Sequence, residues 1–220
     1  MSHIVAIDGP AGAGKSTVAK RVAVSLGFAF VDTGAIYRTV ALAALRRNVS
    51  LDDEKALAEM TADVEMRFET TQDGNRVYLE AEEVTEEIRS RDVSTAASQV
   101  SKHPSVRSKL LETQRSLASK GRGAVLEGRD IGTVVFPDAK TKIFLDASEH
   151  ERATRRAAEL RSKGEEVDFD ELLQEIRDRD ERDRSRDVAP LKPADDAEII
   201  DTTGLSIDDV VARIVDVAES

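Results

Sequence analysis

The chain begins with a short apolar run followed by a glycine-rich loop, and this pairing constrains the fold more than any other feature. Residues 4–7 are Ile-Val-Ala-Ile, and residues 9–16 fit the pattern G-x-x-x-x-G-K-[ST] in full. A loop of this type lies between a strand and a helix, where its backbone N–H groups surround phosphate oxygens and the helix N-terminus adds a positive dipole. The start of the chain therefore predicts a nucleoside triphosphate site in an α/β fold.

Each residue type in this loop has a chemical role. Lys15 has the length to reach the outer phosphates, and the Ser16 hydroxyl is an oxygen ligand that suits Mg²⁺. The alternative interpretation is a glycine-rich surface turn, which the strand–loop–helix context disfavours. The residues expected to hold the triphosphate are Gly9, Pro10, Ala11, Gly12, Ala13, Gly14, Lys15, Ser16 and Thr17.

Composition excludes several classes of function. The chain has no cysteine, which rules out disulfides and thiol chemistry, and its three histidines lie far apart without the spacing of zinc ligands. A net charge of −11 argues against broad binding to nucleic acids or anionic membranes. No apolar run approaches the ~20 residues of a membrane span, and the start lacks the pattern of a signal peptide. We therefore expect a soluble, cytoplasmic protein with a small-molecule ligand.

Apolar runs and turn residues predict alternating strands and helices, and thus an α/β fold with a mostly parallel sheet covered on both faces. Residues 62–85 differ, because apolar and charged residues alternate there around a turn signal at residues 72–75, which predicts a small inserted antiparallel β unit. The expected strands are 3–8, 28–32, 124–127, 142–146 and 198–201. The expected helices are 15–26, 33–47, a short one within 48–60, 86–101, 104–120, 148–163, 168–185 and one capped by Ser206.

Polar residues follow the second predicted strand, at residues 32–38. The carboxyl ends of parallel strands meet at one edge of a sheet, where ligands bind in open α/β folds. Thr33 is expected to cap the next helix and to offer a hydroxyl, with Tyr37 and Arg38 one turn further on. The alternative is ordinary helix capping beside a surface arginine.

A third polar stretch, residues 127–133, follows another apolar strand. Glu127 lies where a carboxylate on the metal side of a phosphate-loop enzyme is expected, and Arg129 and Asp130 form a neighbouring donor and acceptor between glycines. The alternative is a turn carrying a surface ion pair.

Two predicted helices are rich in arginine. In the first, Arg152 shares a helical face with Arg155 and Arg156, and guanidinium groups gathered in this way match polyphosphate oxygens. The alternative is a solvated face on which these arginines pair with nearby glutamates.

The second arginine-rich helix has two charged faces. Arg179, Asp183 and Arg186 fall on one face, and Arg177 and Arg184 fall on the opposite one, so at most one of these faces looks into a cleft. The alternative is a solvated helix with i,i+4 ion pairs such as Arg179 with Asp183. Three polar strand ends beneath two such helices predict a phosphoryl-transfer site, because that transition state needs positioning and charge neutralisation.

Taken together, these stretches resemble the bacterial cytidylate kinases, the (d)CMP kinases of the nucleoside monophosphate kinase group. The phosphate loop is shared with many enzymes, but T-G-A-I-Y-R at 33–38 and G-R-D-I-G-T-V-V-F-P at 128–137 are far more specific. The matching stretches span nearly the whole chain: 7–16, 32–38, 96–100, 127–137, 142–147 and 179–191.

The resemblance implies the P-loop nucleoside monophosphate kinase fold, with a five-stranded parallel sheet flanked by helices, a small antiparallel β insertion and a helical lid. It implies one kinase domain over residues 1–220, which we expect to act as a monomer. Its parts are a core of 1–32, 121–147 and 188–220, a monophosphate-binding part of 33–120 and a lid region of 148–187.

The resemblance also implies residue roles. ATP and Mg²⁺ bind at the phosphate loop, with Ser16 as a metal ligand and Arg152, Arg155 and Arg156 in a mobile lid. Residues implied for the monophosphate and its surroundings are Thr33, Tyr37, Arg38 and Arg129; for the cytosine, Ser98, Arg107 and Asp130; for the sugar and phosphates, Arg179, Asp183 and Arg186. The implied catalytic residues are Lys15, Arg129, Arg179 and Arg186.

The expected reaction is ATP + CMP ⇌ ADP + CDP, a step of pyrimidine nucleotide metabolism, with dCMP as an alternative acceptor. The attacking monophosphate oxygen is already anionic, so no general base is required. One rival is another small-molecule P-loop kinase, such as one for shikimate or a different monophosphate. A nucleotide-gated switch is the other rival, but it needs a guanine-reading N-K-x-D, which this chain lacks.

Overall fold

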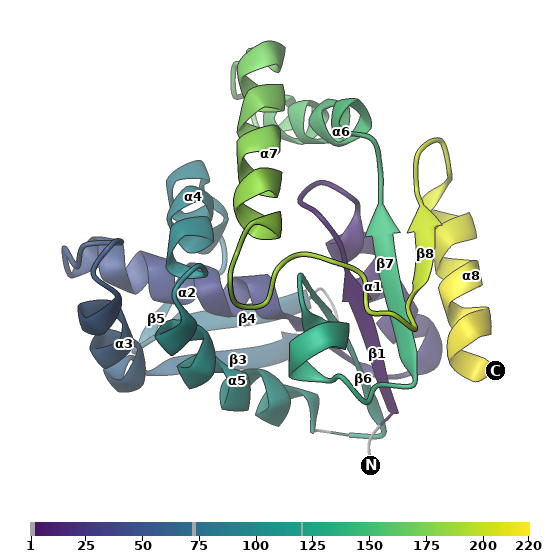
Figure 1. Ribbon diagram of the computed structural model, residues 1–220, viewed down its shortest axis with the longest axis horizontal. Helices are drawn as coiled ribbons and strands as arrows, with labels where there is room; N and C mark the ends of the chain where they lie inside the picture. Colours follow the sequence, from purple (N-terminus) through teal and green to yellow (C-terminus); the bar gives the residue numbers. More distant parts are fainter. Residues whose placement is uncertain (1–2, 72–73, 120) are drawn as a thin grey trace.

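A parallel sheet of five strands organises the molecule, in the order β2-β6-β1-β7-β8 (Figure 1). The computed structural model describes residues 3–71, 74–119 and 121–220. Each strand lies where the sequence predicts one, and every neighbouring pair is parallel. The strands are β1 His3–Asp8, β2 Ala29–Asp32, β6 Gly123–Gly128, β7 Thr141–Asp146 and β8 Glu198–Asp201.

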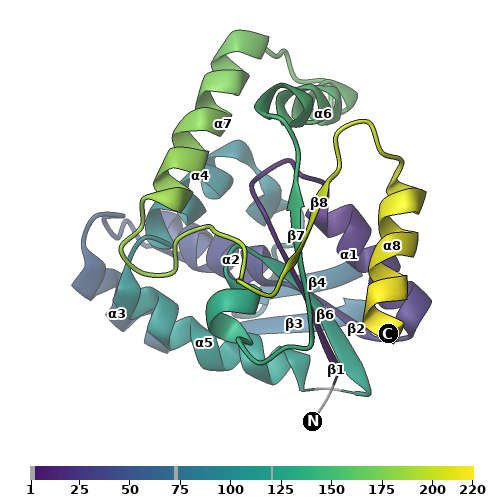
Figure 2. The same cartoon turned by 45° about the vertical axis from the view of Figure 1, so that its right-hand side comes forward.

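Helices cover both faces of this sheet, as alternating strands and helices require. Helices α1 (Lys15–Leu26) and α8 (Ile207–Glu219) pack on one face, where Val22 and Ile214 are fully buried. The opposite face is covered by α5 (Pro104–Ala118) and a π-helical turn, Ile131–Val135 (Figure 2). Among the described residues, no helix combines the length and the apolar character needed to cross a bilayer.

The central strand β1 brings two loops together at one edge of the sheet. Asp8, its last residue, lies opposite Gly128 of β6 on one side and Phe144 of β7 on the other. The phosphate loop that follows β1 and the loop that follows β6 therefore leave the sheet side by side. This register sets the position of the site.

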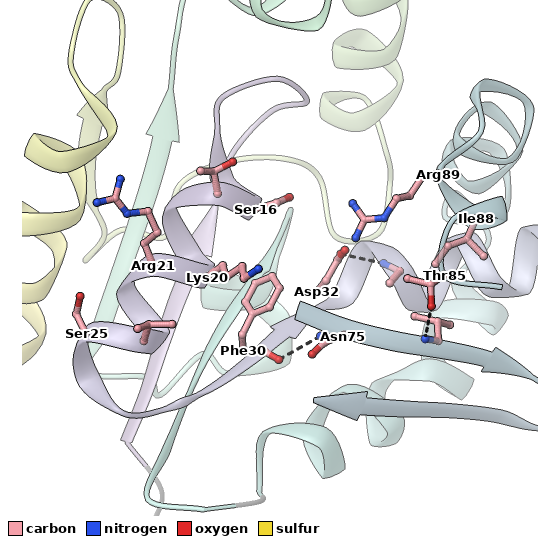
Figure 3. A pocket seen from close by; sticks show the side chains of 14 residues that line it. Ser16, Lys20, Arg21, Ser25, Phe30, Asp32, Asn75, Thr85, Ile88 and Arg89 are labelled. Carbon is pink, nitrogen blue, oxygen red and sulfur yellow. Dashed lines mark hydrogen bonds between the residues drawn. The ribbon is translucent and has the colours of Figure 1, made fainter. Parts of the chain in front are cut away.

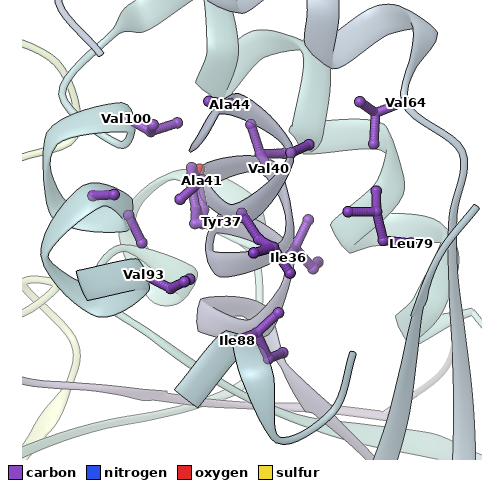
Figure 4. Close-up of a cluster of buried hydrophobic side chains, with 14 of the residues drawn as sticks. Ile36, Tyr37, Val40, Ala41, Ala44, Val64, Leu79, Ile88, Val93 and Val100 are labelled. Atoms are coloured by element: carbon purple, nitrogen blue, oxygen red, sulfur yellow. The ribbon is translucent and has the colours of Figure 1, made fainter. Parts of the chain in front are cut away.

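A large insertion between β2 and β6 has its own core. Its elements are α2 Thr33–Arg46, α3 Glu54–Asp63, β3 Met66–Thr71, β4 Gly74–Leu79, β5 Glu82–Glu83, α4 Arg91–Val100 and then α5. The strands β3-β4-β5 form the predicted antiparallel unit. Ile36, Val40, Leu79, Ile88 and Val93 gather between this sheet and the helices (Figure 4). Of the predicted turn at 72–75, residues 74 and 75 begin β4, and residues 72 and 73 lie outside the described residues.

Two local predictions are wrong. The helix expected over 86–101 is broken at Ser90, whose extended backbone separates a 3-10 turn, Glu87–Arg89, from α4. The Ser90 hydroxyl accepts a hydrogen bond from Val93 N at 3.4 Å and so caps α4. Thr33 is not the cap of α2, because the Asp32 carboxylate accepts from Ala35 N at 2.9 Å instead.

Helices α6 (Glu149–Ser162) and α7 (Phe169–Arg184) form a separate layer beyond the carboxyl ends of the strands (Figure 1). They are held to each other by a small apolar cluster that includes Ala157, Leu172 and Ile176. The second half of α7 has no such apolar face and runs down beside the phosphate loop to contact α4.

The first turn of the phosphate loop leaves no room for a side chain at Gly9. A Cβ atom there would lie 2.0 Å from the carbonyl oxygen of Leu145, on a backbone with φ of 149°. We predict that Gly9→Ala lowers the free energy of unfolding by about 3 kcal/mol, since backbone strain and overpacking add together. Gly27→Ala is the matched control, because Gly27 has φ of 65° but no atom near its Cβ position, and we expect a loss of about 1 kcal/mol. Equal losses in denaturant titrations would contradict this packing.

Candidate functional site

The phosphate loop, residues 9–17, wraps around the ammonium group of Lys15. Gly12 and Gly14 adopt positive φ values of 80° and 85°, which let the chain turn back on itself before α1 begins. The Lys15 Nζ donates to the carbonyl oxygen of Pro10 at 2.6 Å. The loop thus forms a closed cradle at the N-terminus of α1, a position suited to anions.

Charges around Lys15 show which residues meet at this loop. Burial lowers the pKa of Lys15 well below its ordinary value, and repulsion from Arg129 and Arg179 lowers it further, against the attraction of Glu127. Glu127 lies at the end of β6, where burial and then Asp32 raise its pKa to about 7. The structure therefore brings the predicted strand-end carboxylate and the predicted arginines next to the loop lysine.

Asp8 ties the phosphate loop to the loop after β6. Its buried carboxylate accepts from the backbone N–H groups of Ile131 and Gly132, at 2.8 Å each. Burial raises the pKa of Asp8 to about 7 in spite of these two hydrogen bonds. Asp8 therefore holds the segment that carries Arg129 and Asp130 against the end of β1.

Asp183 on α7 lies among three arginines, Arg129, Arg179 and Arg186, which we call the arginine cluster. Its buried carboxylate accepts from Arg129 Nε at 3.0 Å and also from Arg186. Burial alone raises the pKa of Asp183, but the two arginines hold it below its ordinary value. The i,i+4 ion pair between Arg179 and Asp183, which the alternative interpretation expects, is absent among the described residues, where Asp183 pairs with Arg129 and Arg186 instead.

The predicted division of α7 into two faces is confirmed. Arg179 and Asp183 point inward, whereas Arg177 and Arg184 are exposed. Arg186 lies just beyond the helix, and its side chain is buried on the same inward side.

Arg179 carries the least compensated charge of the cluster. Burial lowers its pKa to about 10, and the neighbouring Arg129, Arg38 and Arg186 also disfavour its charged form, opposed by Asp183. Its Nε has no hydrogen-bond partner among the described residues. An anion with several acceptor oxygens is the ligand that such a group fits.

Asp130 forms a buried ion pair with Arg107 of α5 rather than with Arg129, which corrects the pairing expected from their adjacency. Arg107 also donates to the carbonyl oxygen of Ser101 at 3.2 Å. Its guanidinium lies 5.4 Å from the centre of the Tyr37 ring. Burial raises the pKa of Tyr37 to about 12, so this hydroxyl stays protonated.

Two further residues of the predicted monophosphate group are already engaged. The Thr33 hydroxyl donates to the carbonyl oxygen of Glu127 at 2.7 Å, which leaves it lone pairs but no proton for a ligand. Arg38 Nη2 donates a hydrogen bond to the Asp32 carboxylate at 2.8 Å. Both side chains lie at the junction of β2, α2 and β6.

Most buried side-chain atoms without a hydrogen-bond partner, among the described residues, belong to this site. Buried polar groups are nearly always paired, so such a concentration indicates groups arranged for a ligand. They are Tyr37 Oη, Arg38 Nε, Ser98 Oγ, Glu127 Oε1, Arg179 Nε and Arg186 Nε.

The three arginines that were predicted for the lid all lie on α6 but do not share one environment. Arg152 is only 1% exposed, donates to the carbonyl oxygen of Ala11 at 2.9 Å and pairs with Asp180 at 2.5 Å. Arg155 contacts Glu151 and Thr202, and Arg156 contacts Glu159. Arg155 and Arg156 therefore pair with glutamates of their own helix, as the alternative interpretation of a solvated face expects. Arg152 instead links α6 and α7 to the phosphate loop.

A cavity of about 660 Å³ opens between α1 and β4 (Figure 3). Ser16 and Asp32 lie at one side of it, and Lys20 and Arg89 extend into it from α1 and the 3-10 turn. Among the described residues that line this cavity, none is a residue that was predicted to hold the monophosphate. The cavity borders the phosphate loop from the side away from α7.

Sequence reasoning missed three contributors to the site. Asp8 and Asp180 were not singled out, although a carboxylate at the end of β1 directly before a phosphate loop is a usable signal. Ser101 gave no signal at all, since its role depends on arginines from α5 and from the segment after α7.

Comparisons with known proteins bear on this site. Residues 5–220 match the family model described as cytidylate kinase. A cytidylate kinase of Pelotomaculum thermopropionicum is 53% identical over 212 residues, covering 96% of this chain and 93% of its own. One from Actinobacillus succinogenes is 49% identical over 223 residues, covering 99% and 98%. A crystal structure of an uncharacterized protein from Eubacterium ventriosum aligns with a TM-score of 0.54 at 14% identity, covering 100% and 99%, which is a likeness of fold alone.

The raised pKa of Asp8 predicts a pH dependence of stability. Between its ordinary value of 3.8 and about 7, the folded chain keeps a proton at Asp8 that the unfolded chain has released. The associated stability is therefore lost as the pH rises through this window. We predict that the free energy of unfolding falls more steeply from about pH 4 to pH 7 in the unmodified chain than in Asp8→Asn.

The slope, not the absolute stability, is the quantity to compare, because the asparagine also loses one of the two backbone hydrogen bonds. The exposed Asp216→Asn provides the same chemical change on the surface and should keep the original slope. Parallel curves for Asp8→Asn and the unmodified chain would show that Asp8 does not titrate in this range.

Proposed function

This chain belongs to the cytidylate kinase family, and from that premise we propose how its residues divide the work of phosphoryl transfer. The chain is a nucleoside monophosphate kinase that transfers a phosphoryl group from ATP to CMP or dCMP, giving ADP and CDP or dCDP. The observation that carries the assignment of roles is the meeting of Lys15 with Arg129 and Arg179 at the phosphate loop.

The acceptor phosphate is held at the junction of α2 and the loop after β6, by Arg38 and Arg129 with the hydroxyl of Tyr37. Thr33 belongs to its surroundings, because the Thr33 proton is donated to the carbonyl oxygen of Glu127. An oxygen of this phosphate attacks the γ-phosphorus in line, and it needs no general base because it is already anionic. The transition state spreads negative charge over the equatorial oxygens. Lys15, Arg129, Arg179 and Arg186 are the catalytic cations that balance it.

Asp130, Arg107 and Ser98 read the cytosine. A carboxylate accepts hydrogen bonds only, and it therefore suits the N4 amine of cytosine. The Ser98 hydroxyl is buried and has no partner in the described chain, which leaves it available to the base. Asp183 and the neighbouring Arg179 and Arg186 serve the sugar and phosphates.

The triphosphate lies in the loop of residues 9–17, with Arg152, Arg155 and Arg156 in the lid region above it. Mg²⁺ fits the oxygen ligands beside this loop, because the Ser16 hydroxyl is near enough to lower the pKa of Glu127, and Glu127 Oε1 has no partner among the described residues. No group of three or more His, Cys, Asp or Glu in that described part is arranged for a metal, but Mg²⁺ in kinases uses few protein ligands and several from phosphates and water. When bound, the ion neutralises phosphate charge. The cytoplasmic location and the monomeric state stay predictions.

An assay of ADP formation across possible acceptors tests the function. With ATP and Mg²⁺ we expect CMP and dCMP to be phosphorylated in preference to UMP, AMP and shikimate, and chelation of Mg²⁺ to stop turnover. Lys15→Ala should lower turnover by about 10²–10³-fold without a change in melting temperature, since the lysine stabilises transition-state charge. Lys55→Ala, on the exposed side of α3, is the control. A preference for another acceptor, or normal turnover by folded Lys15→Ala, would contradict the proposal.

The base-reading role of Asp130 predicts a change of specificity. Asp130→Asn keeps the shape of the side chain but can present an amide N–H in place of a carboxylate oxygen. The N4 amine of CMP then loses its acceptor, while the O4 carbonyl of UMP no longer faces a second acceptor. We expect the ratio of kcat/KM for CMP over UMP to narrow by about tenfold, mostly through weaker use of CMP. The ratio is the quantity to measure, because weakening the Arg107 ion pair lowers both activities together.

Asp138→Asn is the matched control for this variant. Asp138 lies in the same loop, eight positions further along, but it is exposed and should leave the ratio unchanged. An unchanged ratio in Asp130→Asn would remove the base-reading role from this residue.

A further inference from the structure

Ser101 lies where two arginines of the site meet the end of α4. It is the residue directly after the last turn of this ten-residue helix, and it is only 7% exposed. Arg186 Nη2 donates to its hydroxyl oxygen at 2.9 Å, and Arg107 Nη1 donates to its carbonyl oxygen at 3.2 Å. One small residue therefore contacts a guanidinium from α5 and a guanidinium from the segment after α7.

The hydroxyl of Ser101 has a defined orientation. Its single proton is donated to the carbonyl oxygen of Ser98 at 3.0 Å, one of the helix-end carbonyls that has no partner within a helix. Its lone pairs are then free to accept from Arg186. The hydroxyl thus links a carbonyl oxygen at the C-terminus of α4, the negative end of the helix dipole, to the cationic side chain of Arg186.

Arg186 depends on this contact for its second restraint. The same Nη2 atom of Arg186 also donates to the Asp183 carboxylate. The Nε atom of Arg186 has no hydrogen-bond partner among the described residues. With Asp183 alone, the guanidinium has one anchor on its own segment and is free to pivot about it. The Ser101 hydroxyl adds an anchor on the monophosphate-binding side, from a different part of the chain.

We propose that Ser101 is a positioning residue that sets the orientation of Arg186, and through its carbonyl that of Arg107, for the bound monophosphate. The inference rests on the proposed role of Arg186 in nucleotide binding. Ser101 touches the arginines and acts only through them. It couples the end of α4, which carries Ser98, to the end of α7, so the base-side and lid-side parts of the site are aligned by one hydroxyl.

Removal of the hydroxyl tests this. Ser101→Ala keeps the backbone carbonyl for Arg107 but leaves one Arg186 N–H without its acceptor. We expect kcat/KM for CMP to fall about tenfold, the size typical of losing a hydrogen bond to a charged group. Ser101→Thr retains the hydroxyl and should restore at least half of the original value. Ser108→Ala is the matched control, since that exposed hydroxyl donates to the Pro104 carbonyl oxygen within α5 and contacts neither arginine in the described part of the chain.

A double-mutant cycle separates positioning from a structural effect. In the Arg186→Ala background, Ser101→Ala should cause less than a twofold further loss, because its partner is already gone. A full tenfold loss in that background, or a Ser101→Ala enzyme indistinguishable from Ser108→Ala, overturns the inference. Failure of threonine to rescue overturns it as well.

The proposed function is judged by other results of the same experiment. If the unmodified chain does not phosphorylate CMP, the function itself fails, whereas normal CMP use by Arg186→Ala removes the role of Arg186 and the inference with it. Should Ser101→Ala fold poorly, Ser101→Cys keeps the volume but is a weak acceptor. It should then show the same loss in kcat/KM with an unchanged melting temperature, and normal activity would count against Ser101.

Discussion

The pairing of the Asp183 carboxylate with Arg129 and Arg186 is the interaction on which the site depends. Like charges that are gathered away from water repel strongly, and Arg179 shows this in a pKa lowered to about 10 by burial and by its arginine neighbours. A buried carboxylate between two of the arginines offsets part of that repulsion. Without this carboxylate, repulsion between the arginines would drive the end of α7 away from the loop after β6, and the inward face of the helix would turn toward solvent.

Much of the site was predictable because strand ends and helix periodicity are local properties. The loop at residues 9–17 and the polar residues after β2 and β6 follow apolar runs, and a parallel sheet brings such ends to one edge. The division of α7 into two faces follows from a period of 3.6 residues, whereas the choice of the inward face came from the family resemblance. Asp183 on that face is buried, and Arg177 on the other is exposed.

Pairing partners and helix breaks were not predictable, because tertiary packing decides them. Arg129 and Asp130 are adjacent in sequence, yet Arg129 pairs with Asp183 and Asp130 with Arg107. The break at Ser90 arises where the hydroxyl offers the chain a cap, although the surrounding residues suit a continuous helix. The weak point of sequence reasoning is thus the choice among several possible partners, not the presence of charge.

The buried donors at the site have a consequence for the thermodynamics of the chain. Arg38, Arg179 and Arg186 each keep a buried N–H unpaired within the described chain, and any anion that satisfies them binds the folded form alone. Linkage then raises the unfolding free energy by RT ln(1 + [L]/Kd). We therefore expect phosphate or sulfate in a buffer to act as a stabilising ligand, so that melting temperatures of variants should be compared at a fixed concentration of oxyanions.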